Sequence, residues 1–511
     1  MTTWNAGYVS DLNYTYGYYT ELNPMQAGLA LASRGKKSTK IENACELGFG
    51  HGVSTVIHSA ASNIKWYGND FIPSQALFAS DLTKEAGCDA ELCDDSFEEF
   101  LQRTDLPKLD FIGLHGIWSW ISATNQRLIV EFVRRNLSLG GILYISYNTL
   151  PGWSNFAPVR HLMTEHAKLV GAESGNLSQK IESATAFAKK LVQIESQFLL
   201  SNPSLKLKME EIEKQNVSYL AHEYFNKDWS PIYFSQMAEA LEPCKLNYGA
   251  PAALLDHIDA ANLTTDQSAF IDSISSTILQ QGARDVLVNQ SFRRDLWVKG
   301  VRAMKIGEQL ADLRSKRFVM LANHEDVELK IKGVRGEIEL RKEIYAPILD
   351  SLANAHITTV AELEQSVKKN NVDIAQLFQA IMILAAKGAI RPAQDPEVIE
   401  GAHTKTQRLN KILMERSKLE KGISFLASPV TGGGIGVSRF DQLFLLSVTL
   451  GADDPKSWAE FAWSCLKTEG QKIVKDRKTL ESEEDNRKEL LSQATYFSEK
   501  TLPALKAALI I

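Results

Sequence analysis

The fold is decided by one short stretch, Cys45-Glu46-Leu47-Gly48-Phe49-Gly50-His51-Gly52-Val53-Ser54, which leaves an apolar run and enters an amphipathic one. Glycines at such a strand-to-helix turn allow positive φ angles and let the backbone approach a ligand closely. The helix that follows presents its unpaired first-turn amides at the same place. The stretch therefore predicts a cofactor that lies directly on residues 46–52, with His51 among its contacts.

The spacing of the glycines distinguishes two kinds of cofactor. Dinucleotide-binding enzymes use the spacing G-x-G-x-x-G, whereas here Gly48, Gly50 and Gly52 alternate and Val53 follows. Glu46 stands two residues before the first glycine, and a carboxylate there suits a ligand with a cationic amino-acid head better than it suits a pyrophosphate. We therefore expect S-adenosylmethionine as the cofactor, and the spacing argues against a nicotinamide-dependent dehydrogenase.

The segment from residue 41 to residue 148 alternates short apolar runs with amphipathic ones, which is typical of a parallel sheet covered by helices. We predict strands at residues 41–46, 65–69, 90–93, 109–114 and 141–147, with the pair Gly140-Gly141 as a turn before the last of them. Later strands that return to this sheet are expected at residues 245–248 and 295–298. The pattern predicts an α/β fold with a Rossmann-like sheet.

The remaining chain is mostly helical in pattern. Residues 157–240 are rich in helix-forming residues, as in 179–200 and 205–213. Alternation around Gly333 predicts a hairpin, and helices are expected at residues 345–353, 360–368 and 373–387, a layout compatible with a winged-helix-like unit. A glycine-rich loop is expected at 432–436. The predicted units are a cofactor-binding domain (1–155), a helical insertion (156–240), a return to the sheet (241–305), a winged-helix-like domain (306–400) and a C-terminal helical domain (401–511).

An acidic residue follows the predicted second strand. Asp70 lies about 20 residues beyond the glycines, where a carboxylate can accept hydrogen bonds from both hydroxyls of a ribose. The alternative is a helix N-cap, because Ile72-Pro73 begins a helix directly afterwards. We predict that Asp70 holds the ribose, with Phe71 beside it.

A second acidic segment follows the third strand. Here Asp94, or else Asp95, is predicted to receive the amino group of an adenine, and Phe97 is predicted to pack on its ring. A helix cap is again the alternative, because Ser96 and Glu99 have the spacing of a capping box. Ser96 is included with the predicted adenine contacts.

A tyrosine-rich segment precedes the sheet. Tyr14, Tyr18 and Tyr19 are placed to close over a cofactor with their π faces toward a sulfonium. Packing of an N-terminal arm accounts for each of them singly just as well. As a cluster they predict a functional lid, in which Tyr14 and Tyr18 act in catalysis and Tyr19 contacts the cofactor.

Further candidates lie at the carboxyl edge of the sheet. His115 and Trp118 follow the fourth strand and Asn148 follows the fifth. Because open α/β sheets bind ligands at this edge, we group the three as candidate catalytic residues, with His115 also contacting the cofactor. A histidine there can instead hold its loop by hydrogen bonds. Trp120 is accounted for equally well by the substrate pocket or by core packing.

The sequence gives no sign of a metal site. The five cysteines are scattered and have no CxxC spacing. His222-Glu223-Tyr224 lacks the second histidine of a zinc-protease motif, because position 226 is Asn. These three residues are candidates for the wall of a substrate groove, although one polar face of a helix is the more frequent explanation of such a run.

The composition limits the partners and the compartment. Lys and Arg total 56 against 62 Asp and Glu, a net charge of −6, which disfavours a nucleic-acid partner. The chain has no Pro-Pro pair, hence no tetrapeptide of the kind that holds a flipped base. No charged and apolar leader opens the sequence and no apolar run has the length of a membrane span, so we expect a cytoplasmic protein without a membrane span.

Several segments spread over the chain resemble the bacterial methyltransferases that carry a methyltransferase regulatory domain, among them the rickettsial outer-membrane-protein lysine methyltransferases. The most specific are His115-Gly116-Ile117-Trp118-Ser119-Trp120 and Tyr147-Asn148-Thr149-Leu150-Pro151-Gly152-Trp153. Others match at residues 14–24, 46–52, 219–225, 231–234, 291–296 and 426–436.

The resemblance implies a class I methyltransferase sheet split by a helical insertion, a winged-helix-like C-terminal region and a homodimer. It also implies methylation of lysine side chains on another protein, at the surface or outer membrane of the cell. A small-molecule methyltransferase and a catalytically degenerate binding or regulatory protein are the alternatives. For the second, the apolar helix expected at 373–387 favours contact with protein over contact with DNA.

Overall fold

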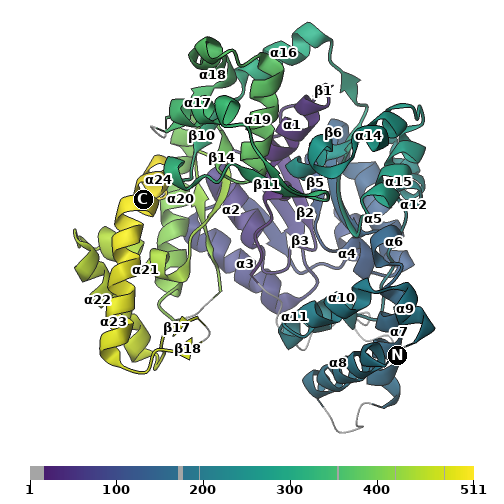
Figure 1. Cartoon of the computed structure of the whole chain (residues 1–511), viewed down its shortest axis with the longest axis horizontal. Coiled ribbons are helices and arrows are strands. Elements are labelled where there is room, and N and C mark those ends of the chain that lie inside the picture. Colours follow the sequence, from purple (N-terminus) through teal and green to yellow (C-terminus); the bar gives the residue numbers. More distant parts are fainter. Residues whose placement is uncertain (1–15, 171–175, 195, 354–355, 420–421, 477) are drawn as a thin grey trace.

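A seven-stranded sheet lies at the centre of the molecule (Figure 1). The structure is a computed structural model, and it describes residues 16–170, 176–194, 196–353, 356–419, 422–476 and 478–511. The strand order is β4-β3-β2-β5-β6-β8-β7. The strands are β2 (Asn43–Leu47), β3 (Lys65–Asn69), β4 (Ala90–Cys93), β5 (Leu109–Leu114), β6 (Leu137–Asn148), β7 (Leu246–Pro251) and β8 (Phe292–Lys299).

The pairing within this sheet confirms the Rossmann-like fold class. Strands β2 to β6 are parallel, whereas β8 runs antiparallel to both of its neighbours, β6 and β7. The three strands predicted at 65–69, 90–93 and 109–114 are confirmed, and the two late strands return to the sheet as expected. The parallel strands place their carboxyl ends at one edge, which is where such sheets bind ligands.

The turn predicted at Gly140-Gly141 is wrong, because β6 runs through both glycines from Leu137. The register between β5 and β6 shifts at this place, and Gly140 has a φ of 82°. A Cβ at Gly140 would lie 2.5 Å from Cγ2 of Thr39. The glycine therefore serves a bulge and a close approach inside the strand.

Helices cover both faces of the sheet. The first part of the chain supplies α1 (Pro24–Ser33), α2 (Val53–Ala61), α3 (Pro73–Ala86), α4 (Phe97–Gln102) and α5 (Ala123–Asn136). Every residue of α2 is buried, because α2 packs against α3 and also against α20 (Pro396–Arg416) of the C-terminal part. The helix that starts at the glycine turn is therefore enclosed by one helix from the N-terminal part of the chain and one from the C-terminal part.

The predicted helical insertion follows β6 and forms a group of short helices with a core of its own. These are α6 (Leu150–Trp153), α7 (Ala157–Leu169), α8 (Leu177–Gln193), α9 (Gln197–Ser201), α10 (Ser204–Ile212) and α11 (Val217–Tyr224). The next helix, α12 (Phe234–Leu241), buries its apolar side chains in the core of the sheet instead. The buried residues of the insertion's own core include Met163, Ile181, Met209 and Leu220. Most of these helices lie together at one end of the molecule in Figure 1.

The segment between β7 and β8 carries α13 (Asp259–Asn262), α14 (Thr265–Asp272) and α15 (Thr277–Leu287). A buried guanidinium joins this segment to the sheet. Arg293 of β8 donates to Asp285 of α15 at 2.5 Å and to Asp295 at 2.8 Å, and Tyr147 of β6 donates to Asp295 at 2.7 Å. One cation therefore balances two buried carboxylates.

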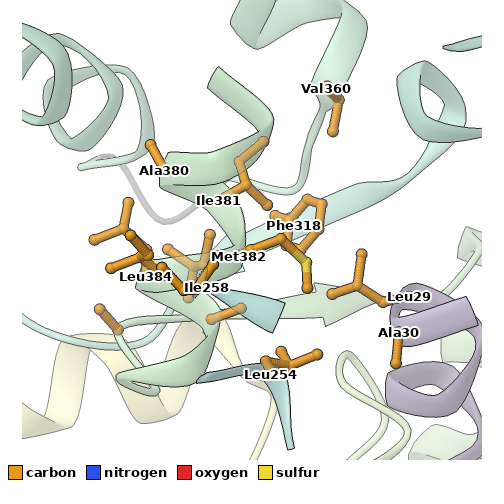
Figure 2. Close-up of a cluster of buried hydrophobic side chains, with 14 of the residues drawn as sticks. Leu29, Ala30, Leu254, Ile258, Phe318, Val360, Ala380, Ile381, Met382 and Leu384 are labelled. Atoms are coloured by element: carbon orange, nitrogen blue, oxygen red, sulfur yellow. The ribbon is translucent and has the colours of Figure 1, made fainter. Parts of the chain in front are cut away.

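A winged-helix-like unit follows β9 (Arg302–Ala303), which pairs with β1 (Lys36–Lys37). It consists of α16 (Ile306–Ser315), β10 (Arg317–Met320), the hairpin β11 (Lys330–Gly333) and β12 (Gly336–Glu339), α17 (Lys342–Leu352), β13 (Thr358–Thr359), α18 (Val360–Val367), α19 (Ile374–Ala386) and β14 (Ile390–Ala393). The hairpin and the three predicted helices are confirmed. Figure 2 shows how α19 and Phe318 share one apolar cluster with Leu29 of α1 and Leu254.

The C-terminal part contains α20, the hairpin β15 (Phe425–Ser428) and β16 (Gly433–Gly436), α21 (Arg439–Thr449), α22 (Pro455–Thr468), the strands β17 (Val474–Lys475) and β18 (Lys478–Thr479), α23 (Glu483–Tyr496) and α24 (Leu502–Ala507). The glycine-rich loop predicted at 432–436 is therefore wrong in part, since residues 433–436 pair with β15 as a strand. Their missing side chains make room for the ring of Tyr18. None of the described helices has the length and apolarity needed to cross a membrane.

We expect Gly433→Ala to lower the free energy of unfolding by about 1–3 kcal/mol, because the new methyl group overpacks a buried contact. A Cβ at Gly433 would lie 2.5 Å from Oη of Tyr18 and 2.7 Å from Nδ2 of Asn23. Denaturant unfolding measures the change. Gly282→Ala in α15 is the control, since its Cβ meets no atom within 4 Å and helix propensity favours alanine. An unchanged midpoint for Gly433→Ala would contradict the packing described here.

Candidate functional site

A cavity opens at the carboxyl ends of β2, β3 and β5, on the ligand-binding edge of the sheet. One side of it is formed by the glycine turn and by the residues that follow β3, β4 and β5. The other side is formed by α11 of the helical insertion. The cavity is lined by Gly17, Tyr19, Glu46, Gly48, Phe49, Gly50, His51, Asn69, Asp70, Phe71, Ile72, Gln75, Ser96, Phe97, Glu98, His115, Gly116, Ile117, Trp120, Ile121, Ser122, Asn125, Tyr219, His222, Glu223, Asn226 and Asp228.

The charges around this cavity are of one sign. Its carboxylate-bearing residues are Glu46, Asp70, Glu98, Glu223 and Asp228, and the described lining includes no Lys or Arg. Such a cavity favours a cationic ligand and opposes a phosphate or pyrophosphate, because opposite charges stabilise one another in a partly desolvated site.

The glycine turn adopts the conformation that its sequence predicts. Gly48 and Gly50 have φ angles of 70° and 60°. The amide of Gly48 donates to the carbonyl of Asn69 at 2.8 Å, and the amide of Gly50 donates to Oδ2 of Asp70 at 2.8 Å. A Cβ at Gly48 would lie 2.6 Å from the Ile117 side chain, so the chain passes close to the loop after β5. The turn thus offers bare backbone to the cavity.

Glu46 is a buried carboxylate at the end of β2, where it lines the cavity. The hydroxyl of Thr55 donates a hydrogen bond to its Oε2 atom. Burial raises the pKa of Glu46 to about 8, against the opposing effect of the Thr55 hydroxyl, and the nearby Asp70 carboxylate raises it further. A carboxyl group that is desolvated in this way gains most from a ligand that brings a positive charge.

Asp70 connects the glycine turn to the segment after β3. Its Oδ2 accepts from the amide of Gly50, and its Oδ1 accepts from the amide of Ile72 at 3.0 Å. Burial raises the pKa of Asp70 to about 6, although the two amides act in the opposite direction. Helix α3 starts at Pro73 with Ile72 as its N-cap residue, so the N-cap predicted as the alternative for Asp70 is wrong.

Tyr19 and His115 form a stacked pair at the cavity wall. Their ring centroids lie 3.7 Å apart with an angle of 20° between the planes. Nδ1 of His115 lies 2.6 Å from the hydroxyl of Tyr144, and the backbone amide of Tyr19 donates to Oγ of Ser54 in α2 at 2.9 Å. Burial, with a contribution from Arg294, lowers the pKa of His115 to about 3. The imidazole is therefore neutral at physiological pH and adds no positive charge to the cavity.

Most of the residues predicted to contact the cofactor share this one cavity. They come from five separate segments of the chain that the fold brings together. They are Tyr19, Glu46, Gly48, Gly50, His51, Asp70, Phe71, Ser96, Phe97 and His115. Ser96 also forms the capping box with Glu99 at the start of α4, so both interpretations of that residue are compatible with its position.

Three predicted cofactor contacts lie away from the cavity wall. Gly52 is the N-cap residue of α2, and a Cβ there would lie 2.6 Å from Cβ of Ala79, so it serves the close packing of α2 on α3. Asp94 is exposed to solvent, and the backbone carbonyl of Asp95 accepts from Nδ2 of Asn69 at 2.9 Å. Glu98, one turn further along the chain, supplies the acidic group on this side.

The residues predicted to act in catalysis lie apart from one another, because His115 is the only one of those that the structure describes to line the cavity. Tyr18 is buried away from the cavity, and its hydroxyl lies 3.0 Å from Nε2 of His58 in α2. Trp118 packs in the apolar core beneath the sheet edge, and Trp120 lines the cavity in its place. These positions give no support to a lid role for Tyr18 or to a catalytic role for Trp118. Tyr14 lies outside the described residues.

Asn148, the last residue of β6, is also buried away from the cavity wall. Its backbone amide donates to Oγ of Ser119 at 2.8 Å, and its carbonyl accepts from the amide of Ile232 at 2.9 Å. Its Nδ2 atom is buried without a hydrogen-bond partner among the described residues. The structure therefore gives Asn148 a place in the strand connection, and its predicted catalytic role has no contact to support it.

The wall formed by α11 and the loop after it was predicted only in part. His222 and Glu223 were candidates, whereas Tyr219, Asn226 and Asp228 were not recognised. The positions 219, 222, 223 and 226 have the spacing of one helix face. That spacing is visible in the sequence, but the sequence does not show that this face turns toward the sheet.

Comparison with known proteins places the chain among methyltransferase-like proteins. Residues 216–299 match the model of a family described as "Predicted methyltransferase regulatory domain". The protein sll1526 of Synechocystis is 38% identical over 508 residues, covering 98% of this chain and 99% of its own. The protein RP789 of Rickettsia prowazekii is 22% identical and covers 94% and 90% of the two chains.

A solved structure of similar extent is that of PKMT2 from Rickettsia typhi in complex with AdoHcy. It is 16% identical to this chain, covers 97% of it and 99% of its own length, and has a TM-score of 0.69. At this identity the likeness establishes the fold. It covers the sheet, the insertion and the C-terminal part together.

We expect Asp70→Asn to speed hydrogen exchange in the glycine turn, at residues 47–53, by about tenfold, because an amide cannot replace both acceptor oxygens. Mass spectrometry of peptides after exchange measures this. The free energy of global unfolding should change less than the local exchange rate. Burial raises the pKa of Asp70 to about 6, so its charge opposes folding at neutral pH, and the variant removes that charge.

The control for this variant is Asp81→Asn, which changes an exposed residue of α3. It should leave exchange at residues 47–53 as in the unaltered protein. Equal exchange in Asp70→Asn and the unaltered protein would mean that the turn holds its shape without the carboxylate.

Proposed function

Because the chain belongs to the class I methyltransferase family that carries the methyltransferase regulatory domain, we propose that it transfers the methyl group of S-adenosylmethionine to lysine side chains of another protein. The observation that carries the proposal is the cavity at the sheet edge, with its carboxylates and without a Lys or Arg in the described lining. Both the sulfonium of this cofactor and the ammonium of a lysine are cations.

The residues present fit the cofactor. Glu46 is a buried carboxylate for the ammonium of the methionine part, and the backbone at Gly50 is open, since a Cβ there would meet only Oε1 of Gln75, at 3.8 Å. Asp70 has a fixed orientation from its two amide donors, and its remaining lone pairs are acceptors for ribose hydroxyls. Phe97 lines the part of the cavity near β4 and is an apolar surface for the adenine.

S-adenosylmethionine, when bound, supplies a methyl group on a positively charged sulfur that a neutral amine can displace. The chain then has to orient the acceptor, exclude water and avoid positive charge near the sulfur. The stacked pair of Tyr19 and neutral His115 suits this task, because aromatic faces attract cations and the imidazole carries no charge.

Lysine as the acceptor is supported by the acidic wall opposite the glycine turn, which carries Glu223 and Asp228. It agrees with the resemblance to the rickettsial lysine methyltransferases and with the likeness in fold to PKMT2.

We expect binding of S-adenosylmethionine to release a proton near pH 7. Glu46, whose pKa is about 8, is largely protonated in the free protein, and a bound ammonium favours its carboxylate form. The affinity should therefore rise as the pH increases toward about 8. Calorimetry in two buffers of different ionisation enthalpy measures the released proton.

Glu46→Gln should bind the cofactor about 10–100-fold more weakly and without proton release, because a charge-assisted hydrogen bond is lost. Glu42→Gln, at an exposed residue just before β2, is the matched control and should behave like the unaltered protein. If the unaltered protein does not bind the cofactor saturably, the proposed function fails.

We further expect lysine methylation to appear on protein. Radiolabel from methyl-labelled S-adenosylmethionine should enter the protein fraction of a cell extract, and mass spectrometry should find it on lysine. A glycine-turn variant, Gly48→Val, should abolish it, since a β-branched residue is strained at a φ of 70°. If the label appeared only in the small-molecule fraction, the acceptor would be a metabolite and not a protein.

A further inference from the structure

The acceptor side of the cavity has an unusual helix face. Tyr219, His222, Glu223 and Asn226, from α11 and the residues just after it, line the cavity, while Leu220 packs into the core of the insertion. A polar helix face normally turns to solvent. Here it turns inward, toward the glycine turn and the stacked pair of Tyr19 and His115. This orientation places the Glu223 side chain at the cavity, on the side where an acceptor would lie.

We propose that Glu223 is the acidic residue that receives the ammonium group of the acceptor lysine and removes its proton before methylation. This inference rests on the proposed function and identifies the group that makes the acceptor reactive. Two of the other carboxylates of the cavity are less suited to it. Glu46 and Asp70 are held at the glycine turn by Thr55 and by backbone amides, respectively.

Glu223 carries a carboxylate without an ion-pair partner. Among the described residues, no Lys or Arg nitrogen lies within 4 Å of it and no hydrogen bond reaches its side-chain oxygens. The two cations that lower its pKa each make another contact. Arg160 of α7 donates to the carbonyl of Asn226 at 3.0 Å, and Lys208 of α10 lies over the ring of Trp153 at 5.7 Å. The carboxylate is therefore free to take a cation from outside the chain.

The surroundings of Glu223 suit the apolar stem of a lysine. Trp120 and Tyr219 line the same part of the cavity and present aromatic surface. Nε1 of Trp120 donates to the backbone carbonyl of Glu223 at 3.3 Å, which connects the loop after β5 to α11. Aromatic side chains beside a carboxylate complement a long alkyl chain with a terminal ammonium.

The pKa of the Glu223 carboxyl group also suits the proton transfer. Burial raises the pKa of Glu223 to about 7, against the opposing effects of Lys208 and Arg160. The groups that face it are Arg160 of α7, Lys208 of α10, Tyr219, His222 and Tyr224 of α11, and Asp228 of the following loop. A base with a pKa near the working pH is the most effective proton acceptor.

The proton balance is simple. The lysine ammonium gives one proton to the Glu223 carboxylate, which becomes a neutral carboxyl group, and the lysine nitrogen becomes a neutral amine with a free electron pair. That pair forms the new nitrogen–carbon bond, while the electron pair of the broken carbon–sulfur bond stays on sulfur. The carboxyl group then returns its proton to solvent, and the methylated nitrogen carries the positive charge.

Glu223→Gln tests the inference, because glutamine keeps the size of the side chain and removes the charge. In the protein saturated with AdoHcy, calorimetry with n-butylammonium as a probe of the lysine side chain should show at least about tenfold weaker binding than in the unaltered protein. Methyl transfer to extract protein should fall by about 10²–10⁴-fold near pH 7. It should recover toward pH 10, where lysine begins to lose its own proton.

The matched control is Glu210→Gln, which removes an exposed carboxylate of α10 in the same insertion and should behave like the unaltered protein. Cofactor affinity should be the same in all three proteins, which separates this inference from the proposed function. Equal probe binding in Glu223→Gln and the unaltered protein would overturn it, as would a loss of activity that does not depend on pH. The absence of probe binding in the unaltered protein would also overturn it.

Discussion

The interaction on which the rest of the site depends is the pair of amide hydrogen bonds to Asp70. One carboxylate accepts from the amide of Gly50, in the turn before α2, and from the amide of Ile72, just before α3. It therefore fixes the N-termini of these two helices relative to each other, and with them the distance between the turn and the end of β3. The ligand-binding edge is formed before any ligand arrives, so little conformational entropy remains to be lost on binding.

The site combines two parts of different origin. The sheet edge supplies rigid groups on short loops, while the helical insertion supplies the wall that faces them. Hydrogen bonds connect the two parts, such as that from Nε1 of Trp120 to the carbonyl of Glu223. A fixed part suits a constant cofactor, and a wall on a separate group of helices can differ between relatives without disturbing the sheet.

Sequence patterns predicted the local elements because these depend on short-range chemistry. The glycine turn, the parallel strands and the acid at residue 70 follow from spacing and residue type within about 20 residues. Which of two similar neighbours reaches the cavity could not be predicted. Tyr18 and Tyr19 turn to opposite sides of one extended segment, and Trp118 and Trp120 lie on opposite sides of one short turn. Such choices are decided by packing partners far away in the chain, as is the inward direction of α11.

The contact between Tyr18 and the β15–β16 hairpin joins the two ends of the chain. Its ring packs on Gly433 and Gly434, its hydroxyl meets His58 of α2, and its neighbour Tyr19 stacks on His115 at the cavity. The C-terminal part is therefore a structural support for the site and cannot be regarded as a detachable appendage. A chimera that takes its C-terminal part from a relative would also need that relative's segment around residue 18. The two ends of the chain are therefore constrained to evolve together.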